Sequence, residues 1–278
     1  MKTRQILEVA DALRRGNQRQ DWGLFGPGSA TWKINRETVL LLGGGRALLM
    51  QVAHPSVAAG VVQHSRYDVD PWGRLLRTLD VVTAITFGDT ETSERAAARL
   101  RAVHRYVRGN REDGTQYEAG DPELLRWVWA TLVDTSLLVY STYVEPVPVI
   151  EAERFYEEQK RFAQACGIPE GSWPVNYEAF KAYVHETISH GLNVGPEARD
   201  IAAHVLAPSL PAPVALVAKP SLELLKLTTL GLLPVSLREQ YGYEWGPVRE
   251  QVFRRSTVAT RGLVGLLPGV VRQFPAAR

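Results

Sequence analysis

The apolar residues of this chain repeat with the period of an α-helix almost from end to end, and this pattern limits the fold more than any other feature. Apolar side chains at i, i+3, i+4 and i+7 form one face of a helix, whereas a half-buried strand alternates apolar and polar residues. Alternating runs are scarce here. We therefore expect an all-α fold. The pattern predicts helices near residues 3–16, 37–51, 55–64, 72–87, 92–108, 121–141, 149–166, 176–189, 197–206, 219–230, 235–240 and 245–263.

Turns rich in glycine and proline separate the predicted helices, and no internal repeat, low-complexity tract or linker interrupts the series. With 278 residues, 45% of them hydrophobic, the chain can bury a substantial core and enclose a cofactor cavity. We expect a single multi-helix globular domain over residues 1–278. Residues 1–35 would form an N-terminal helical extension and residues 36–275 the core.

Charge and cysteine content exclude several classes of function. The formal net charge is +2, and 26 of the 32 basic residues are arginine, but no long basic run is interleaved with aromatic residues. Nucleic acid is therefore not an expected partner. Cys166 is the only cysteine, which excludes an internal disulfide and a cysteine cluster for an iron–sulfur centre. A lone cysteine is more often a packed side chain than a thiolate ligand.

The first 22 residues, MKTRQILEVADALRRGNQRQDW, carry charges throughout and lack the apolar core of a secretory signal. We therefore expect a cytoplasmic protein. No window of about 18 uncharged apolar residues predicts a transmembrane segment. The segment ALVAKPSLELLKLTTLGLLP is nevertheless apolar enough for transient contact with a membrane or an apolar substrate.

Two of the predicted helices bring together groups that suit a haem pocket. In GRLLRTLDVVTAITFG, at roughly 100° per residue, Arg74 and Thr78 stand one above the other with Arg77 beside them. In SERAAARLRAVHRYVRG, His104 falls on the apolar stripe that should face the core, and Gly109 should end the helix. Alternatively, His104 is a hydrogen-bonded core histidine, and the arginines pair with nearby aspartates.

These residues, in their order along the chain, resemble the family of latex-clearing rubber oxygenases and fungal MpaB oxygenases. The resemblance runs from about residue 43 to about residue 275. Its other markers are MQVAHPSVAAGVVQHSRYDVDPWGR, YEAGDPELLRWVWATL, GLLPVSLREQYGYEW and LLPGVVRQFP. Each marker is short, so the assignment depends on their common order and spacing.

The resemblance implies an all-helical fold that binds haem b through an axial histidine, with an arginine, a lysine and a threonine on the distal side. By matching positions, His104 would be the metal ligand, and Arg74 and Thr78 the distal pair. Arg77 stands where the rubber-cleaving members have lysine. Arginine does not deprotonate in proteins and is a poor ligand, so we expect water or no ligand opposite His104. No glutamate here matches the carboxylate base of those members, which argues against polyisoprene as substrate.

General chemistry supports the same assignment. A neutral imidazole donates electron density to iron, while cations and hydroxyls stabilise negative charge on bound dioxygen or peroxide. Arginine also pairs with carboxylates such as haem propionates. Arg74, Arg77 and Thr78 are therefore candidates for catalysis, and the two arginines also for cofactor binding.

His54 and His64 are further candidates for cofactor binding. They bracket the small-residue segment VAAGVV, which would let a flat ring approach closely. Alternatively, each histidine satisfies local backbone groups.

Other motifs predict less. The three glycines before Arg46 lack the spacing of a phosphate loop, and close helix packing explains them more simply. In HETISH the histidines are five apart, whereas a zinc protease motif needs four. His204 has no partner that the sequence identifies.

The sequence therefore predicts a haem-b-dependent, oxygenase-like enzyme. Its partners would be dioxygen and a small apolar substrate, such as an unsaturated isoprenoid or lipid. Two alternatives remain: a non-catalytic haem-binding protein, such as a sensor or carrier, and a helical protein that has lost its cofactor.

Overall fold

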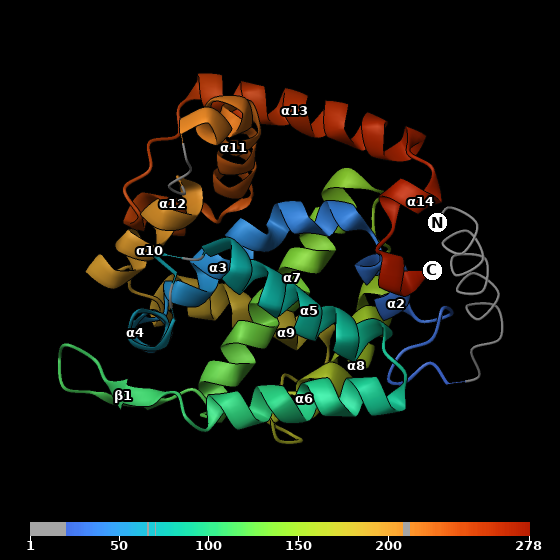
Figure 1. Ribbon diagram of the computed structural model, residues 1–278, viewed down its shortest axis with the longest axis vertical. Helices are drawn as coiled ribbons and strands as arrows, with labels where there is room; N and C mark the ends of the chain where they lie inside the picture. The colour runs from blue at the N-terminus through green and yellow to red at the C-terminus, as the bar shows by residue number, and fades with distance from the viewer. Residues whose placement is uncertain (1–20, 66, 70, 208–211) are drawn as a thin grey trace, which may run out of the picture.

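The computed structural model describes residues 21–65, 67–69, 71–207 and 212–278, and within these the fold is all-α, as predicted (Figure 1). The predicted helix at residues 3–16 lies outside the described residues. The α-helices are α2 Ala30–Asn35, α3 Gly44–Val52, α4 Pro55–His64, α5 Pro71–Phe87, α6 Thr90–His104, α7 Pro122–Tyr143, α8 Val149–Ala165, α9 Tyr177–Glu186, α10 Pro196–Leu206, α11 Ala212–Leu232, α12 Val235–Gln240, α13 Pro247–Leu266 and α14 Gly269–Arg272. Short 3-10 or π segments are η1 Thr38–Gly43, η2 Thr187–Gly191 and η3 Pro275–Ala277, and β1 Arg108–Asn110 pairs with β2 Gln116–Glu118 in an antiparallel hairpin.

Most predicted boundaries agree with these helices, and those of α4 and α12 agree to the residue. The predicted helix at 37–51 instead divides into η1 and α3. The helix predicted at 219–230 extends over Ala212–Leu232, with Pro220 inside it. The pattern did not predict α2, α14 or the hairpin. These two helices and the two strands are each only three to six residues long.

Helix α3 lies at the centre, in contact with α4, α7, α10 and α11 (Figure 1). Side chains from distant segments donate to its last carbonyls. Trp127 Nε1 donates to the Met50 carbonyl at 3.1 Å, and Tyr241 Oη donates to the Leu49 carbonyl at 2.7 Å. The Leu49 carbonyl also accepts from the backbone N–H of Ala53 at 3.1 Å, so the two side-chain bonds add to the bonding at the helix end and join α3 to α7 and to the end of α12.

Close packing explains Gly43 and Gly45, two of the three glycines at the start of α3. A side chain at Gly43 would place its Cβ 2.6 Å from Thr135 Cγ2 of α7. A side chain at Gly45 would collide with Thr229 of α11. The glycines therefore let α7 and α11 approach the central helix, as the sequence suggested.

Arg46 is the main polar group in this packed region, and it is only 4% exposed. Its guanidinium donates to Asp134 Oδ2 at 2.6 Å and to the Thr135 hydroxyl, both on α7. Its Nε donates to the Leu232 carbonyl at the end of α11, at 2.9 Å. One side chain of α3 thus holds two other helices.

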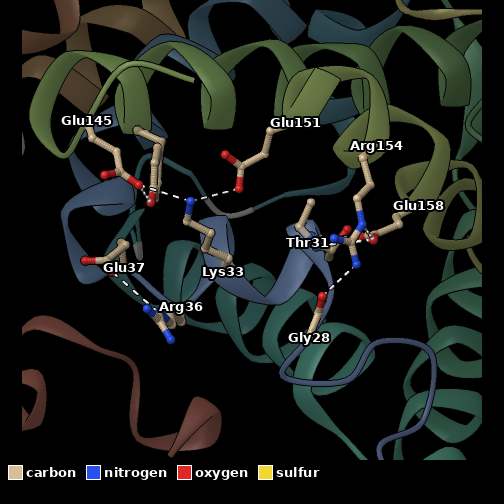
Figure 2. Close-up of polar contacts among 11 residues, drawn as sticks. Gly28, Thr31, Lys33, Arg36, Glu37, Glu145, Glu151, Arg154 and Glu158 are labelled. Carbon is tan, nitrogen blue, oxygen red and sulfur yellow. Dashed lines mark hydrogen bonds and ion pairs between the residues drawn. The ribbon is translucent and has the colours of Figure 1, made fainter. Parts of the chain in front are cut away.

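A second polar network joins α2 to α8 (Figure 2). Glu158 of α8 accepts from the N–H groups of the first two residues of α2, at 3.2 and 2.7 Å, and so caps this helix. Arg154 donates to Glu158 and to the Gly28 carbonyl. Lys33 lies between Glu145 and Glu151, at 3.0 and 2.8 Å. These contacts fix α2 against α8.

The C-terminal segment returns to cover η1. Glu37 and Gln273 form an isolated antiparallel bridge. Arg272 Nε donates to the buried Glu37 carboxylate at 2.6 Å, and the Thr38 hydroxyl donates to the Arg272 carbonyl at 2.9 Å. The last helices are thereby tied to the beginning of the described chain.

Replacement of Arg46 by leucine should lower the free energy of unfolding by about 2–4 kcal/mol, because Asp134 and the Leu232 carbonyl would lose their partner. We place the value below that of a fully buried ion pair because the Asp134 side chain is 30% exposed. Urea unfolding followed by circular dichroism measures it. The matched control is Arg95→Leu, which removes an exposed pair with Glu91 and should change little. Equal losses in the two variants would contradict the role of Arg46.

Candidate functional site

A tight turn fixes α5 and α6 against each other at one end. Asp89 caps α6 by accepting from Thr92 N at 2.8 Å. The N–H and hydroxyl of Thr90 donate to Asp21 at 3.0 and 2.8 Å. A side chain at Gly88 would collide with the Ala84 carbonyl, so glycine is required where the chain reverses. This turn sets the relative position of the two helices that carry the predicted haem residues.

From this turn the two helices diverge toward Pro71 and His104, their far ends (Figure 1). Half-buried side chains of both helices, among them Val81, Val82 and Leu100, pack against the main hydrophobic core. The predicted distal residues lie near the start of α5, and the predicted iron ligand is the last residue of α6. The fold therefore places both groups toward the diverging ends of one helix pair.

His104 is half-buried, and its Nδ1 has no hydrogen-bond partner in the part of the chain that the structure describes. Burial lowers the pKa of this imidazole, because the charged form loses its hydration. A neutral histidine with a buried, unsatisfied nitrogen is costly unless something binds it. The predicted inward orientation of His104 agrees with this burial.

The side of the site on α5 is less enclosed. Arg77 and Thr78 are exposed, and both interact with other groups. Arg74 lies one turn before Thr78 on the same helix, but its side chain falls outside the described part. The helical spacing of the three positions is thus confirmed, whereas their roles stay predictions.

Helix α6 ends at His104, five residues before Gly109, where the sequence predicted its end. The reason is a contact with a distant residue: Ala119 N donates to the Val107 carbonyl at 2.8 Å, and β1 begins at the next residue. Gly109 lies within β1, where it pairs with Tyr117. His104 therefore sits at a helix terminus, beside a hairpin that packs on α4.

The two other candidate histidines lie in different environments. His64 is exposed, and its Nε2 donates to the Arg108 carbonyl of β1 at 3.1 Å, which favours the local interpretation for this residue. His54 precedes α4 and is half-buried, and its Nδ1 lacks a partner among the described residues. Burial lowers the pKa of His54, and the positive charge of Arg111 lowers it further. His54 therefore stays a candidate for cofactor binding.

The segment that leads into α5 is held by a contact that the sequence did not reveal. Tyr67 Oη donates to Asp200 Oδ2 of α10 at 2.5 Å. Burial and this hydrogen bond raise the pKa of Tyr67 to about 12. His204, for which no partner was identified, donates from Nδ1 to the Asp200 carbonyl at 2.9 Å and packs its ring edge-on against Tyr67. The four-residue spacing of Asp200 and His204 was the available signal for their contact.

The remaining motifs do not form sites in the described part of the chain. His185 and His190 are exposed, and His190 pairs with Glu186 at 3.3 Å. Among the described residues, no three histidine, cysteine, aspartate or glutamate side chains form a metal-binding group. Burial raises the pKa of Cys166 to about 12, so it is a thiol and a packed side chain. No described helix combines the length and apolar character needed to cross a bilayer.

Comparison of the sequence with known proteins identifies a family. Residues 32–262 match the profile of the family described as ER-bound oxygenase mpaB/B'/rubber oxygenase, catalytic domain. The chain belongs to this family. An uncharacterized protein of Mycobacterium bovis and one of Mycobacterium tuberculosis are each 29% identical to it over 213 residues, which cover 74% of this chain and 81% of each relative. No solved structure matches the chain. The resemblance inferred from short motifs is thus confirmed.

In the protein without haem, the free energy of unfolding should fall as the pH drops below about 6.5, the ordinary pKa of histidine. The lowered pKa of His104 means that the unfolded chain binds this proton more tightly than the folded chain. Stability from neutral His104 is therefore complete above that pH and is lost as the pH falls toward the lowered pKa. His104→Gln should reduce this dependence, as measured by urea unfolding between about pH 5 and pH 7.5.

The matched control for this prediction is His64→Gln, since His64 is exposed. This control should keep the pH dependence of the unchanged protein. If His104→Gln also kept it, the burial of a neutral imidazole at residue 104 would be refuted.

Proposed function

We propose that this protein is a haem-b-dependent oxygenase that uses dioxygen to oxidise a small apolar substrate. The observation that supports this best is the buried, unpaired nitrogen of His104, on the helix that pairs with the arginine-bearing α5. Membership of an oxygenase family supplies the class of reaction. The proposed substrate is an unsaturated isoprenoid or lipid, in keeping with the apolar side chains of α5 and α6 that face the core.

The described residues fit a haem on the side of the iron ligand. Iron needs a neutral imidazole, and burial keeps His104 neutral by lowering its pKa. A haem iron also needs only one protein ligand on this side, so the lack of a larger metal-binding group among the described residues is compatible with it. His104 would hold the iron, and the bound haem would supply the redox chemistry for activation of dioxygen.

Arg74, Arg77 and Thr78 on α5 would orient the haem and stabilise negative charge. A guanidinium at Arg74 or Arg77 can pair with a haem propionate through its planar fork. A guanidinium or the Thr78 hydroxyl can also stabilise negative charge that develops on dioxygen during its reduction. Because Arg77 stays protonated, it would donate hydrogen bonds and would not compete with dioxygen for iron. We propose that these three residues would bind the haem propionates or stabilise this charge.

His104→Ala should remove most of the Soret band that the purified protein shows after addition of haem, because the iron would lose its ligand. The measurement is an absorption spectrum beside a circular dichroism spectrum that verifies folding. His64→Ala is the matched control and should keep the band, since this exposed ring bonds only to a backbone carbonyl among the described groups. A full band with an unchanged iron spectrum in His104→Ala would refute the ligand, and so would loss of the band only in His54→Ala. No band in any of these proteins would favour a protein that has lost its cofactor.

Dioxygen consumption should rise when the haem-loaded protein receives an alkene such as dispersed squalene. Arg74→Ala or Thr78→Ala should reduce the turnover rate by roughly 100-fold, the usual cost of removing one donor from a site of developing negative charge. An oxygen electrode measures this rate, with and without added reductant. The control is Arg99→Ala, at an exposed position of α6. A normal Soret band without consumption of dioxygen, for any alkene tried, would favour a haem-binding sensor or carrier.

A further inference from the structure

Helix α13 exposes several large apolar side chains, although a surface helix normally turns such residues toward the core. It lies along one edge of the molecule, over α11 and the end of α7 (Figure 1). Its inner face carries Ser256, Thr257 and Thr260 beside Phe253 and the buried Val264. The large apolar side chains that α13 exposes are Val248, Val252, Val258, Leu263 and Leu266. A surface helix whose inner face carries half-buried hydroxyls and whose outer face exposes several large aliphatic groups indicates a further apolar partner.

These exposed residues form a stripe. At about 100° per residue, positions 248, 252, 259 and 266 fall on one side of the helix, within a sector of about 40°. Val248 is 75% exposed and Leu266 is 84% exposed, although they lie at opposite ends of α13. We call this surface the α13 stripe, formed by Val248, Val252, Ala259 and Leu266 with the flanking Val258 and Leu263.

The stripe continues into an uncharged segment. Residues 262–271, GLVGLLPGVV, contain no charged or polar side chain and are flanked by Arg261 and Arg272. Val270 and Val271 at its end are 69% and 57% exposed. Val264 and Leu267 of this segment face the protein, and its other residues are exposed. A largely exposed apolar segment that ends a helix and turns at a proline is suited to enter the outer part of a bilayer.

The charges on α13 indicate which apolar partner is favoured. The helix contains four arginines and one acidic residue, Glu250. Arg254 pairs with Glu250, and Arg261 donates to the carbonyls of Ser141 and Thr142. Arg255 is exposed in the middle of the stripe. A long arginine side chain can lie along an apolar surface while its charged end reaches a phosphate.

We propose that the α13 stripe and residues 262–271 dock on the surface of an anionic lipid bilayer. Interfacial helices bind by burying an apolar face among acyl chains while basic residues contact anionic headgroups, and α13 offers both features. A second copy of this chain is a poorer occupant. A two-fold contact centred on the stripe would bring the two Arg255 guanidiniums together, which is unfavourable. The proposal goes beyond the oxygenase function and does not depend on haem.

The test is co-sedimentation of the full chain with vesicles of phosphatidylcholine that contain about one third phosphatidylglycerol. We expect binding that is stronger than to pure phosphatidylcholine and that weakens with salt. Leu266→Ser and Val270→Ser lie at exposed sites, so folding should be retained. Leu266→Ser should weaken binding roughly tenfold, the usual effect of one leucine side chain left in water. Arg255→Gln should remove part of the preference for anionic vesicles.

The matched control is Val175→Ser, an exposed valine on the loop before α9. It should leave binding unchanged. If the unchanged protein does not bind these vesicles, or if Leu266→Ser and Val175→Ser bind alike, the proposal is wrong. Sedimentation velocity without lipid tests the other occupant: a dimer that Leu266→Ser converts to a monomer would overturn lipid docking in favour of self-association.

Discussion

The structure depends on one buried guanidinium. Arg46 projects from the central helix and satisfies a carboxylate and a hydroxyl on α7 together with a carbonyl at the end of α11. A buried charge is stable only when nearly all of its donors are used, so these three segments must keep fixed positions relative to one another. Gly43 and Gly45 allow that approach, because a side chain at either position would collide with α7 or α11. Close packing and charge satisfaction therefore support each other at the centre of the fold.

The proposed haem residues lie outside this centre, on the α5–α6 helix pair. The α5–α6 pair is fixed at its turn by Asp89 and by contacts to Asp21, and the helices diverge from there. At the other end, the imidazole Nδ1 of His104, the last residue of α6, has no hydrogen-bond partner among the described residues. An unsatisfied buried group lowers stability, and a bound ligand is one way to satisfy it. The contrast with Arg46, whose donors are satisfied, is the physical reason to look for a ligand at His104.

Periodicity predicted most helices because each buries one face along its length. It failed where contacts between distant residues decide the outcome. The end of α6 depends on pairing between Val107 and Ala119, which no local pattern contains. Helix α2 is too short for a periodic signal, and beside its local cap Ser29 it uses Glu158, more than a hundred residues away, as acceptor for its first two N–H groups. For the candidate site, spacing placed Arg74, Arg77 and Thr78 correctly along one helix. It could not reveal that Tyr67 and Asp200 tie the preceding segment to α10.

The residue types on α5 and α6 suit different roles in the proposed pocket. His104 offers a lone pair, because burial lowers its pKa and keeps it neutral. Arg77 offers only hydrogens, because a guanidinium does not deprotonate in a protein. In the proposed function, iron would therefore be held by His104 of α6 and not by Arg77, and the groups on α5 would stabilise developing negative charge. A lysine at residue 77 would not separate the two roles in this way, since a lysine that loses its proton can itself bind iron. Arginine at this position thus favours a site whose α5 side remains open to dioxygen and substrate.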